Sequence, residues 1–283
     1  MWIRILGTAA GGGLPQWNCG CAECTAARRT GAGRSQDCLA VSGDGQAWYL
    51  VNASPDLRTQ LLSAPELAPA PGTRDTPLRG VLLTSGELDH TLGLLTLREA
   101  ALLTVHATAP VREALARAFP VGPLLAAYTE VGWHTVRPGE PLALAGGLRA
   151  EAFTLGGKRP RYAAGLAGST DWVVGYRFTA QHGSACAVYA PGLAEWSPAM
   201  DRAVEQADLV LLDGTFAAPD EFGRRTAGMG HLAVADSLPR LARRPGPRYL
   251  YTHLNNTNPL GRRPPPWEVT GAGIAEDGLL IEL

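Results

Sequence analysis

Short apolar segments, each bounded by glycine, proline or polar residues, recur along the chain and predict a fold rich in β-strands. Residues 42–46, with the sequence SGDGQ, join two of these segments as a predicted hairpin. The predicted strands are residues 2–6, 38–42, 47–52, 80–84, 149–154, 172–178, 186–190, 208–213, 248–253 and 279–282.

Helical periodicity is strongest in residues 111–119, 197–206 and 232–243. Pro110 and Pro198 lie near two of the expected helix starts, where a proline is tolerated. Strands interspersed with helices favour an α+β fold in which two packed sheets are flanked by helices. Periodicity alone does not separate this arrangement from other layouts of helices and strands.

The length of the chain predicts one domain over residues 1–283. The proline-rich residues 262–266 are expected to form an exposed loop, because a final strand at 278–282 must still return to the sheet. Residues 65–79 and 156–169 are similarly irregular, and either could form a lid over a site.

The charge of the chain is nearly balanced, with a formal net charge of −1 and a sequence pI of about 6.6. This balance argues against a general binder of nucleic acid or membrane surfaces and favours a small-molecule partner. No signal peptide and no apolar run of about 20 residues is evident, so a soluble cytoplasmic protein is expected. Almost every basic residue is arginine, and Lys158 is the only lysine.

Cys19, Cys21 and Cys24 are crowded into one short segment. Cys-x-Cys spacing is too close for an easy disulfide, whereas three thiolates on a tight turn converge naturally on one tetrahedral cation. The spacing therefore favours structural zinc over unliganded thiols or redox chemistry, with a fourth ligand that the pattern does not identify. Cys38 and Cys186 stand alone in apolar strands and are predicted to be core residues.

Asp89 and His90 follow the apolar run 81–83, at the end of a predicted strand. A carboxylate and an imidazole offered at one point are what a catalytic metal requires. His253 ends another apolar strand, His231 precedes a predicted helix, and Asp213 ends a third apolar segment. Agreement among these strand ends favours a metal centre over isolated structural histidines. The other histidines, predicted to be ordinary surface or hydrogen-bonded residues, are His106, His134 and His182.

Two other kinds of chemistry are disfavoured by the motifs. Residues 11–13 are glycines, but no Gly-Lys-Ser/Thr follows them and no helix is signalled, so a turn is a better interpretation than a phosphate loop. The chain has no Gly-x-Ser-x-Gly nucleophile elbow. Acyl-enzyme chemistry is therefore not expected.

Several ordered motifs together resemble the coenzyme PQQ synthesis B family, within the metallo-β-lactamase-like superfamily. The resemblance extends over essentially the whole chain and implies an αββα sandwich with the site at one edge of the two sheets. The motifs are GTAAGGGLPQWNCGCAEC at 7–24, NASPDLRTQL at 52–61, SGELDHTLGLLTLRE at 85–99, YAPGL at 189–193, LLDGTF at 211–216, MGHLA at 229–233 and THLNNTNP at 252–259.

The resemblance also implies a reduced metal site. The superfamily pattern is His-x-His-x-Asp-His, and this chain has Ser85 and Glu87 at the first two histidine positions. Asp89, His90 and His253 then remain as ligands of a single metal. Two histidines and one carboxylate match the facial arrangement by which non-haem Fe(II) supports O₂ chemistry beside a substrate.

The family resemblance implies hydroxylation, dependent on iron and O₂, of the tyrosine-derived ring of a cross-linked Glu-Tyr precursor of PQQ. Its partners would be this small molecule and O₂, with neither nucleic acid nor membrane. His231, oriented by Asp213, would move a proton, although Asp213 could instead bind the metal directly. Ser85 and Glu87 would line the substrate side.

An anionic substrate calls for cationic contacts, and guanidinium groups grip carboxylates with two hydrogen bonds. The candidates, which could equally be solvated surface residues, are Arg159, Arg161, Arg224 and Arg225.

By the same resemblance, Cys19, Cys21 and Cys24 hold structural zinc. Related phosphodiesterases supply the fourth ligand as a histidine at the position of Asn256, so here water, a backbone atom or a neighbouring side chain would complete the shell. Two other functions remain open: a hydrolase with one Zn²⁺, and a carrier of PQQ or its precursor that performs no catalysis.

Overall fold

The computed structural model describes residues 1–283 except 182, 222–228 and 263–271. Its framework is a pair of seven-stranded mixed sheets. In spatial order, the first sheet contains β14 (Leu280–Glu282), β1 (Trp2–Gly7), β2 (Cys38–Ser42), β3 (Trp48–Val51), β4 (Leu78–Leu82), β5 (Leu102–Thr108) and β6 (Glu130–Val136). The second contains β13 (Ala272–Ile274), β12 (Arg248–Thr252), β11 (Leu209–Asp213), β10 (Cys186–Ala190), β9 (Val173–Ala180), β8 (Leu148–Gly156) and β7 (Pro141–Leu144).

The two sheets pack face to face because the side chains that point toward the opposite sheet are apolar. The side chains on the other face of each sheet are also apolar and pack against helices. In β2, Leu39 and Val41 point between the sheets and join a cluster with Tyr176 and Leu211 of the opposite sheet. The intervening residues of the same strand, such as Ala40, belong to a second cluster that includes helical residues. Each sheet therefore has an inner face toward the other sheet and an outer face toward helices.

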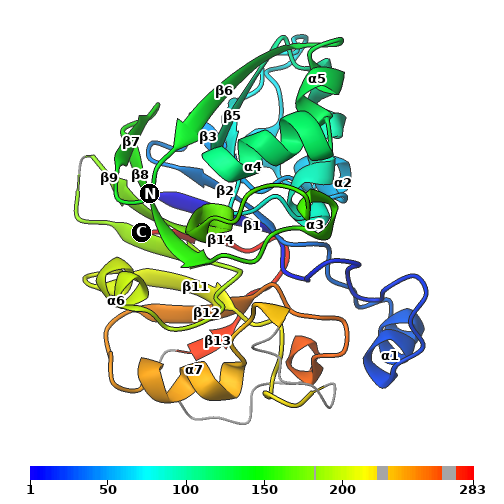
Figure 1. The fold of residues 1–283 in the computed structure, drawn as a ribbon, viewed down its shortest axis with the longest axis vertical. Helices are drawn as coiled ribbons and strands as arrows, with labels where there is room; N and C mark the ends of the chain where they lie inside the picture. Colours follow the sequence, from blue (N-terminus) through cyan, green and yellow to red (C-terminus); the bar gives the residue numbers. More distant parts are fainter. Residues whose placement is uncertain (182, 222–228, 263–271) are drawn as a thin grey trace.

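The helices flank the sheets on their outer faces, and Figure 1 shows α4 and α5 beside the first sheet and α6 and α7 beside the second. This arrangement is the predicted α+β sandwich, an αββα layering. The α-helices are α1 (Ala22–Thr30), α2 (Leu57–Leu62), α3 (Leu88–Thr91), α4 (Ala109–Glu113), α5 (Val121–Leu125), α6 (Pro198–Val204) and α7 (Val234–Leu241). The helical segments of 3₁₀ or π type are Pro65–Leu67, Leu92–Glu99, Ala114–Ala118, Arg161–Ala163, Thr170–Trp172 and Pro259–Gly261.

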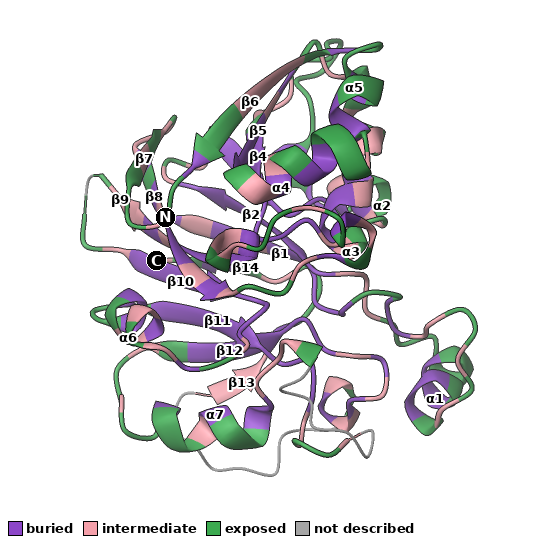
Figure 2. Ribbon diagram, viewed as in Figure 1, coloured by how far each residue is buried: buried purple, intermediate pink, exposed green. Residues whose placement is uncertain are grey.

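Burial follows these layers. In Figure 2 the central strands are buried along most of their length, whereas the outer surfaces of α4, α5 and α7 are exposed. Cys38 and Cys186 are 1% and 2% exposed and pack in the core, as predicted.

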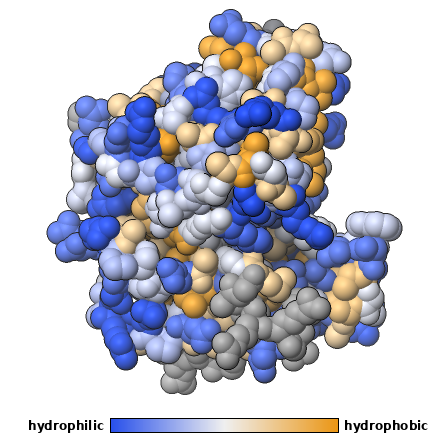
Figure 3. Space-filling model, viewed as in Figure 1, coloured by the Kyte–Doolittle hydropathy of each residue, from blue (hydrophilic) through white to orange (hydrophobic). Residues whose placement is uncertain are grey.

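On the face in view, hydrophilic residues are interspersed with smaller hydrophobic groups (Figure 3). Among the described residues, no helix has the length and apolar character needed to cross a bilayer.

The topology brings several chain segments to one edge of the sandwich. Strands β4 and β5 run parallel in the first sheet, and β10, β11 and β12 run parallel in the second. A bridge between Ser85 and Val173 connects the two sheets just beyond β4. A second bridge, between Ala9 and Leu254, connects the end of β1 to the segment that follows β12. The loops after β4, β11 and β12 therefore meet at this edge, where predicted site residues are located.

Candidate metal centre

Asp89 and His90 are positioned by the short helix α3, which begins directly after the loop that follows β4. Asp89 lies in the first helical turn, where the positive end of the helix favours a carboxylate. His253 comes from the opposite sheet, just beyond β12. Its Nε2 atom lies 3.4 Å from Asp89 Oδ2, and His90 Nε2 lies 4.0 Å from the same oxygen. Three residues predicted as ligands therefore converge on one point.

His253 has a φ of 57°, an unusual left-handed conformation for a residue other than glycine. Such a conformation costs free energy and persists only where neighbouring contacts impose it. Here the Leu254 amide, next in the chain, donates to the Thr8 carbonyl across the site edge. The imposed turn directs the imidazole toward Asp89.

Hydroxyl groups orient both imidazoles from behind. His90 Nδ1 lies 2.8 Å from Ser85 Oγ, and His253 Nδ1 lies 2.9 Å from Thr215 Oγ1. Since the Thr215 hydroxyl donates to Asp213 Oδ1, it accepts from the Nδ1–H group of His253. With the proton on Nδ1, the lone pair of His253 lies on Nε2, which is the arrangement that a metal-binding histidine requires.

The two Nε2 atoms are buried and, among the described residues, have no hydrogen-bond partner. His90 and His253 are each 4% exposed, so water does not readily compensate for the missing bonds. Unpaired lone pairs beside the carboxylate of Asp89 fit a bound cation. Asp89, His90 and His253 also satisfy the distance expected of a ligand group, with donor atoms within 4.8 Å of one another.

Electrostatics at these residues support the same assignment. Burial acts to raise the pKa of Asp89, but the two histidines outweigh it and hold that pKa well below its usual value. Burial likewise acts to lower the pKa of His253, yet Asp89, Asp37 and Asp213 raise it to about 9. His90 behaves differently, because burial lowers its pKa to about 4. Carboxylates thus surround His253 with negative potential that favours a proton or a metal cation.

Asp213 and His231 form a pair beside this group. Asp213 Oδ2 lies 2.7 Å from His231 Nδ1, and the Asp213 side chain is fully buried. The rings of His231 and His253 are stacked, with centroids 5.4 Å apart. Asp213, His231 and His253 form a second group whose donor atoms lie within 4.8 Å of one another. The geometry therefore permits Asp213 either to orient His231 or to bind a metal.

A cavity of about 480 Å³ opens over these residues. Ser85 and Glu87, whose predicted role is to line the substrate side, contribute to its wall together with His231 and Arg161. Of the two irregular segments considered as lids, 156–169 contributes to this lining and 65–79 does not.

The other predicted arginines are placed differently. The guanidinium group of Arg159 donates to the carbonyl of Leu166 and is not part of the cavity lining. Arg224 and Arg225 lie outside the described residues, as does His182. Two residues of the site were absent from the predictions: Thr215, which contacts both His231 and His253, and Lys158, which lines the cavity. The LLDGTF motif includes Thr215, but a threonine after an aspartate carries no distinctive signal.

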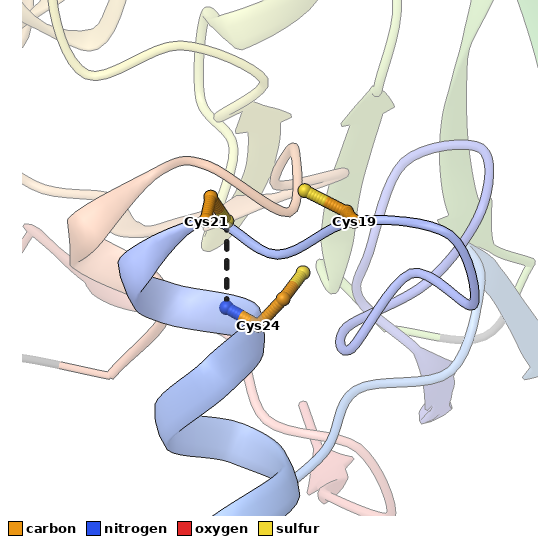
Figure 4. A group of neighbouring side chains, drawn as sticks. All are labelled: Cys19, Cys21 and Cys24. Atoms are coloured by element: carbon orange, nitrogen blue, oxygen red, sulfur yellow. Dashed lines mark hydrogen bonds between the residues drawn. The ribbon is translucent and has the colours of Figure 1, made fainter.

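The cysteine cluster lies at the start of α1, where Figure 4 shows the three side chains around one small space. Cys21 is the N-cap residue, and its sulfur accepts from the Cys24 amide at 3.4 Å. The three sulfur atoms lie within 4.8 Å of one another. Backbone and side-chain hydrogen bonds from Cys21 lower the pKa of Cys19, whereas burial raises that of Cys24.

Asn256 closes the open side of this cluster. Its Nδ2 atom lies 3.2 Å from Cys19 Sγ and 3.4 Å from Cys24 Sγ, and its backbone oxygen lies 3.7 Å from Cys21 Sγ. The two ends of an asparagine amide are assigned from their hydrogen bonds, and rotation by 180° would present Oδ1 to the cluster instead. Three thiols and an adjacent amide therefore fit one cation, held close to the loop that carries His253.

His106 and His134 lie away from the site, on β5 and β6. Their rings are stacked at a centroid distance of 5.0 Å, and burial lowers the pKa of His106 to about 4. Among the described residues neither belongs to a group with metal-binding geometry.

Comparisons with known proteins agree with this arrangement. The beta-lactamase superfamily domain matches residues 47–254. Coenzyme PQQ synthesis protein B of Cupriavidus necator is 38% identical over 99% of both chains, and that of Methylococcus capsulatus is 38% identical over the full length of both. The corresponding protein of Pseudomonas aeruginosa is 37% identical, also over both full lengths.

Solved structures show the same fold. The crystal structure of Zn²⁺-bound PqqB from Methylobacterium extorquens superposes with a TM-score of 0.90 at 34% identity, over all of both chains. A diphosphatase of the PhnP family shares the fold at a TM-score of 0.72 and 22% identity, covering 100% of this chain and 97% of that one. The chain therefore belongs to the coenzyme PQQ synthesis protein B family of the metallo-β-lactamase superfamily.

Proposed function

We propose that the protein is a mononuclear iron hydroxylase of PQQ biosynthesis, acting with O₂ on the tyrosine-derived ring of a cross-linked Glu-Tyr intermediate. The observation that carries this proposal is the convergence of two unpaired imidazole Nε2 atoms with one carboxylate oxygen. Two histidines and one carboxylate with open positions are typical of non-haem Fe(II) oxygenases. Family membership supports the pathway, since the relatives carry the name coenzyme PQQ synthesis protein B.

In this proposal Asp89, His90 and His253 hold the iron. Bound Fe(II) would supply the O₂ chemistry needed to hydroxylate an aromatic ring, with two electrons from an external reductant converting the second oxygen atom to water. The protein would keep the ligands in place through Ser85 and Thr215, whose hydroxyls bond the Nδ1 atoms of the two histidines. The cavity of about 480 Å³ would hold the substrate ring beside them.

His231 would act as the proton carrier. Asp213 holds its Nδ1 atom at 2.7 Å, so Nε2 remains free to exchange a proton with the substrate phenol. Imidazole suits this role because it titrates near neutral pH.

The cysteine cluster would hold structural zinc and brace the loop that carries His253. Cys19, Cys21 and Cys24 supply thiolates, and Asn256 lies against all three sulfur atoms. Asn256 is three residues after His253, so the position of one site constrains the other.

A test of the proposal begins with protein prepared without O₂ and loaded with either Fe(II) or Zn²⁺. We expect O₂ consumption and hydroxylated product when the cross-linked intermediate and a two-electron reductant such as ascorbate are added to the Fe(II) form, because the second oxygen atom of O₂ must be reduced to water. His90→Ala should abolish both, while His106→Gln, a buried histidine outside the cavity, should retain them. Fe(II) protein that binds the intermediate without turnover would instead identify a carrier.

A hydrolase with one Zn²⁺ is the second candidate, because the Methylobacterium extorquens relative was crystallised with Zn²⁺ bound. Zinc has a higher intrinsic affinity than iron for most sites of this kind. Cleavage of a phosphoester or ester by the Zn²⁺ form under strict anaerobiosis would favour the hydrolase over the hydroxylase.

A further inference from the structure

Lys158 lies in the segment that follows β8 and lines the cavity beside the candidate metal centre. Its Nζ atom lies 3.9 Å from Glu87 Oε1, a separation that permits electrostatic attraction but is longer than a direct hydrogen bond. The side chain remains 46% exposed. A cationic group at the cavity wall is thus available to a ligand.

The stem of Lys158 is held against the other wall of the cavity. A Cβ atom on Gly230 would lie 2.7 Å from Lys158 Cδ, so the lack of a side chain at Gly230 leaves room for the lysine stem in this position. Gly230 also has a φ of 84°, a conformation that favours glycine, and it directly precedes His231. The lysine stem therefore packs beside the proposed proton carrier.

A second contact fixes the segment from the side of α3. The Tyr162 hydroxyl donates to the carbonyl of Gly86, the residue before Glu87. Lys158 and Tyr162 thus connect the same segment to two neighbouring residues of the loop after β4. These contacts restrict where the ammonium group can lie, which lowers the entropy lost when it binds a ligand.

Among the described residues, the positive charge in the cavity lining comes from few side chains. The carboxylate of Asp89 lies next to His90 and His253. The guanidinium group of Arg159 is not a candidate for binding a ligand in the cavity, because it donates to the Leu166 carbonyl. Within the described cavity lining, the cationic side chains are Lys158 and Arg161.

We propose that Lys158 is the carboxylate-binding residue of this cavity. Its ammonium group would shift from the distant Glu87 contact to a direct, charge-assisted hydrogen bond with a carboxylate of an aromatic ligand. The choice of carboxylate rests on the proposed role in PQQ biosynthesis. Binding itself does not require turnover, so it can be tested separately from hydroxylation.

The first experiment measures binding of PQQ, a polycarboxylate, and of its fully esterified methyl ester to the Zn²⁺-loaded protein. One hydrogen bond to a charged group contributes roughly 1.5–3 kcal/mol, so Lys158→Gln should weaken PQQ binding by about 12- to 150-fold. Binding of the ester should not change. Lys158→Arg should retain most of the affinity for PQQ, since it keeps the positive charge.

Arg117→Gln provides the matched control, because it removes one positive charge from an exposed ion pair outside the cavity lining. Inorganic phosphate is tested as a competitor. Displacement of PQQ by phosphate at equal concentration would identify a general anion site and overturn the carboxylate assignment. Circular dichroism and thermal unfolding establish that each variant is folded.

The presence of a single lysine permits an independent chemical test. Acetylation removes the charge of Lys158, whereas reductive dimethylation keeps it. Both reagents also modify the amine of Met1, so Lys158→Arg protein treated in parallel reports on that group alone. We expect acetylation to weaken PQQ binding in the wild type but not in Lys158→Arg, dimethylation to preserve most of it, and bound PQQ to protect Lys158.

The proposal is overturned if wild-type protein does not bind PQQ, or if Lys158→Gln and Arg117→Gln bind it equally well. It is also overturned if the ester loses affinity as much as PQQ does. Failure of the hydroxylase proposal would look different: Lys158-dependent binding would persist, but Fe(II) protein would consume no O₂ with the intermediate.

Discussion

Replacement of Thr215 by valine removes one hydroxyl while keeping the size and branching of the side chain. The hydroxyl lies 2.9 Å from His253 Nδ1, 3.0 Å from His231 Nδ1 and 2.7 Å from Asp213 Oδ1. Without it, His253 loses the acceptor that keeps the proton on Nδ1 and the lone pair on Nε2. Thr215→Val should therefore reduce metal affinity although Thr215 is not itself a proposed ligand.

The expected magnitude follows from the contacts of the hydroxyl. Loss of a group that orients a metal-binding histidine typically lowers metal affinity by about 10- to 100-fold. This range corresponds to about 1.4–2.7 kcal/mol. Ser85→Ala should have a similar effect through His90, since Ser85 Oγ lies 2.8 Å from His90 Nδ1.

The assay is competition for Zn²⁺ against a chromophoric chelator, with metal content measured at the end. Ser85 and Thr215 support different histidines. The double variant Ser85→Ala/Thr215→Val should therefore lose metal-binding free energy by about the sum of the two single losses, and any departure from the sum reports coupling through the shared metal. Thr154→Val is the matched control, since its hydroxyl contacts Asp171 and no histidine of the site. Unchanged affinity in Thr215→Val, or an equal loss in Thr154→Val, would refute this account of how His253 is held.

Three further predictions concern other parts of the molecule. His231→Gln should lower kcat by roughly 10²- to 10⁴-fold with unaltered metal content, if the residue carries a proton; loss of metal would indicate that it is a ligand. Cys21→Ser should lower zinc content and weaken metal binding at the site of His253, and normal affinity there would contradict the coupling through Asn256. Asp37→Leu leaves the buried hydroxyls of Tyr189 and Thr252 without their acceptor. The free energy of unfolding, measured with urea, should therefore fall by about 2–6 kcal/mol. A fall of less than about 0.5 kcal/mol would show that another group replaces the carboxylate.

The predicted strands correspond well to the central strands of both sheets, because those strands are buried and almost continuously apolar. Strands β5, β6, β7 and β13 were not among the predicted ranges. Strand β6 is an edge strand with exposed polar positions, and its pattern gives little contrast with a loop. The helix predicted at 111–119 begins at Ala109 as α4 and continues as a π-helical turn over Ala114–Ala118, where the helical period changes.

The candidate ligands were accessible to sequence reasoning because each follows an apolar strand. Asp89 and His90 are also adjacent, which makes their pairing visible without a structure. Thr215 and Lys158 lacked such a signal, since their significance depends on contacts with residues far away in the chain. Arginine was expected to be the anion-binding residue, which led to the prediction of Arg159. Its guanidinium group instead donates to the nearby Leu166 carbonyl.

The proposed metal ligands come from segments that belong to different sheets. Asp89 and His90 belong to the first sheet's side of the sandwich, and His253 follows a strand of the second. A cation held by all three would therefore act as a cross-link between the two layers at their open edge. Removing it should let the backbone amides of both loops exchange with solvent more rapidly, and in concert, while amides in the middle of the sandwich remain protected.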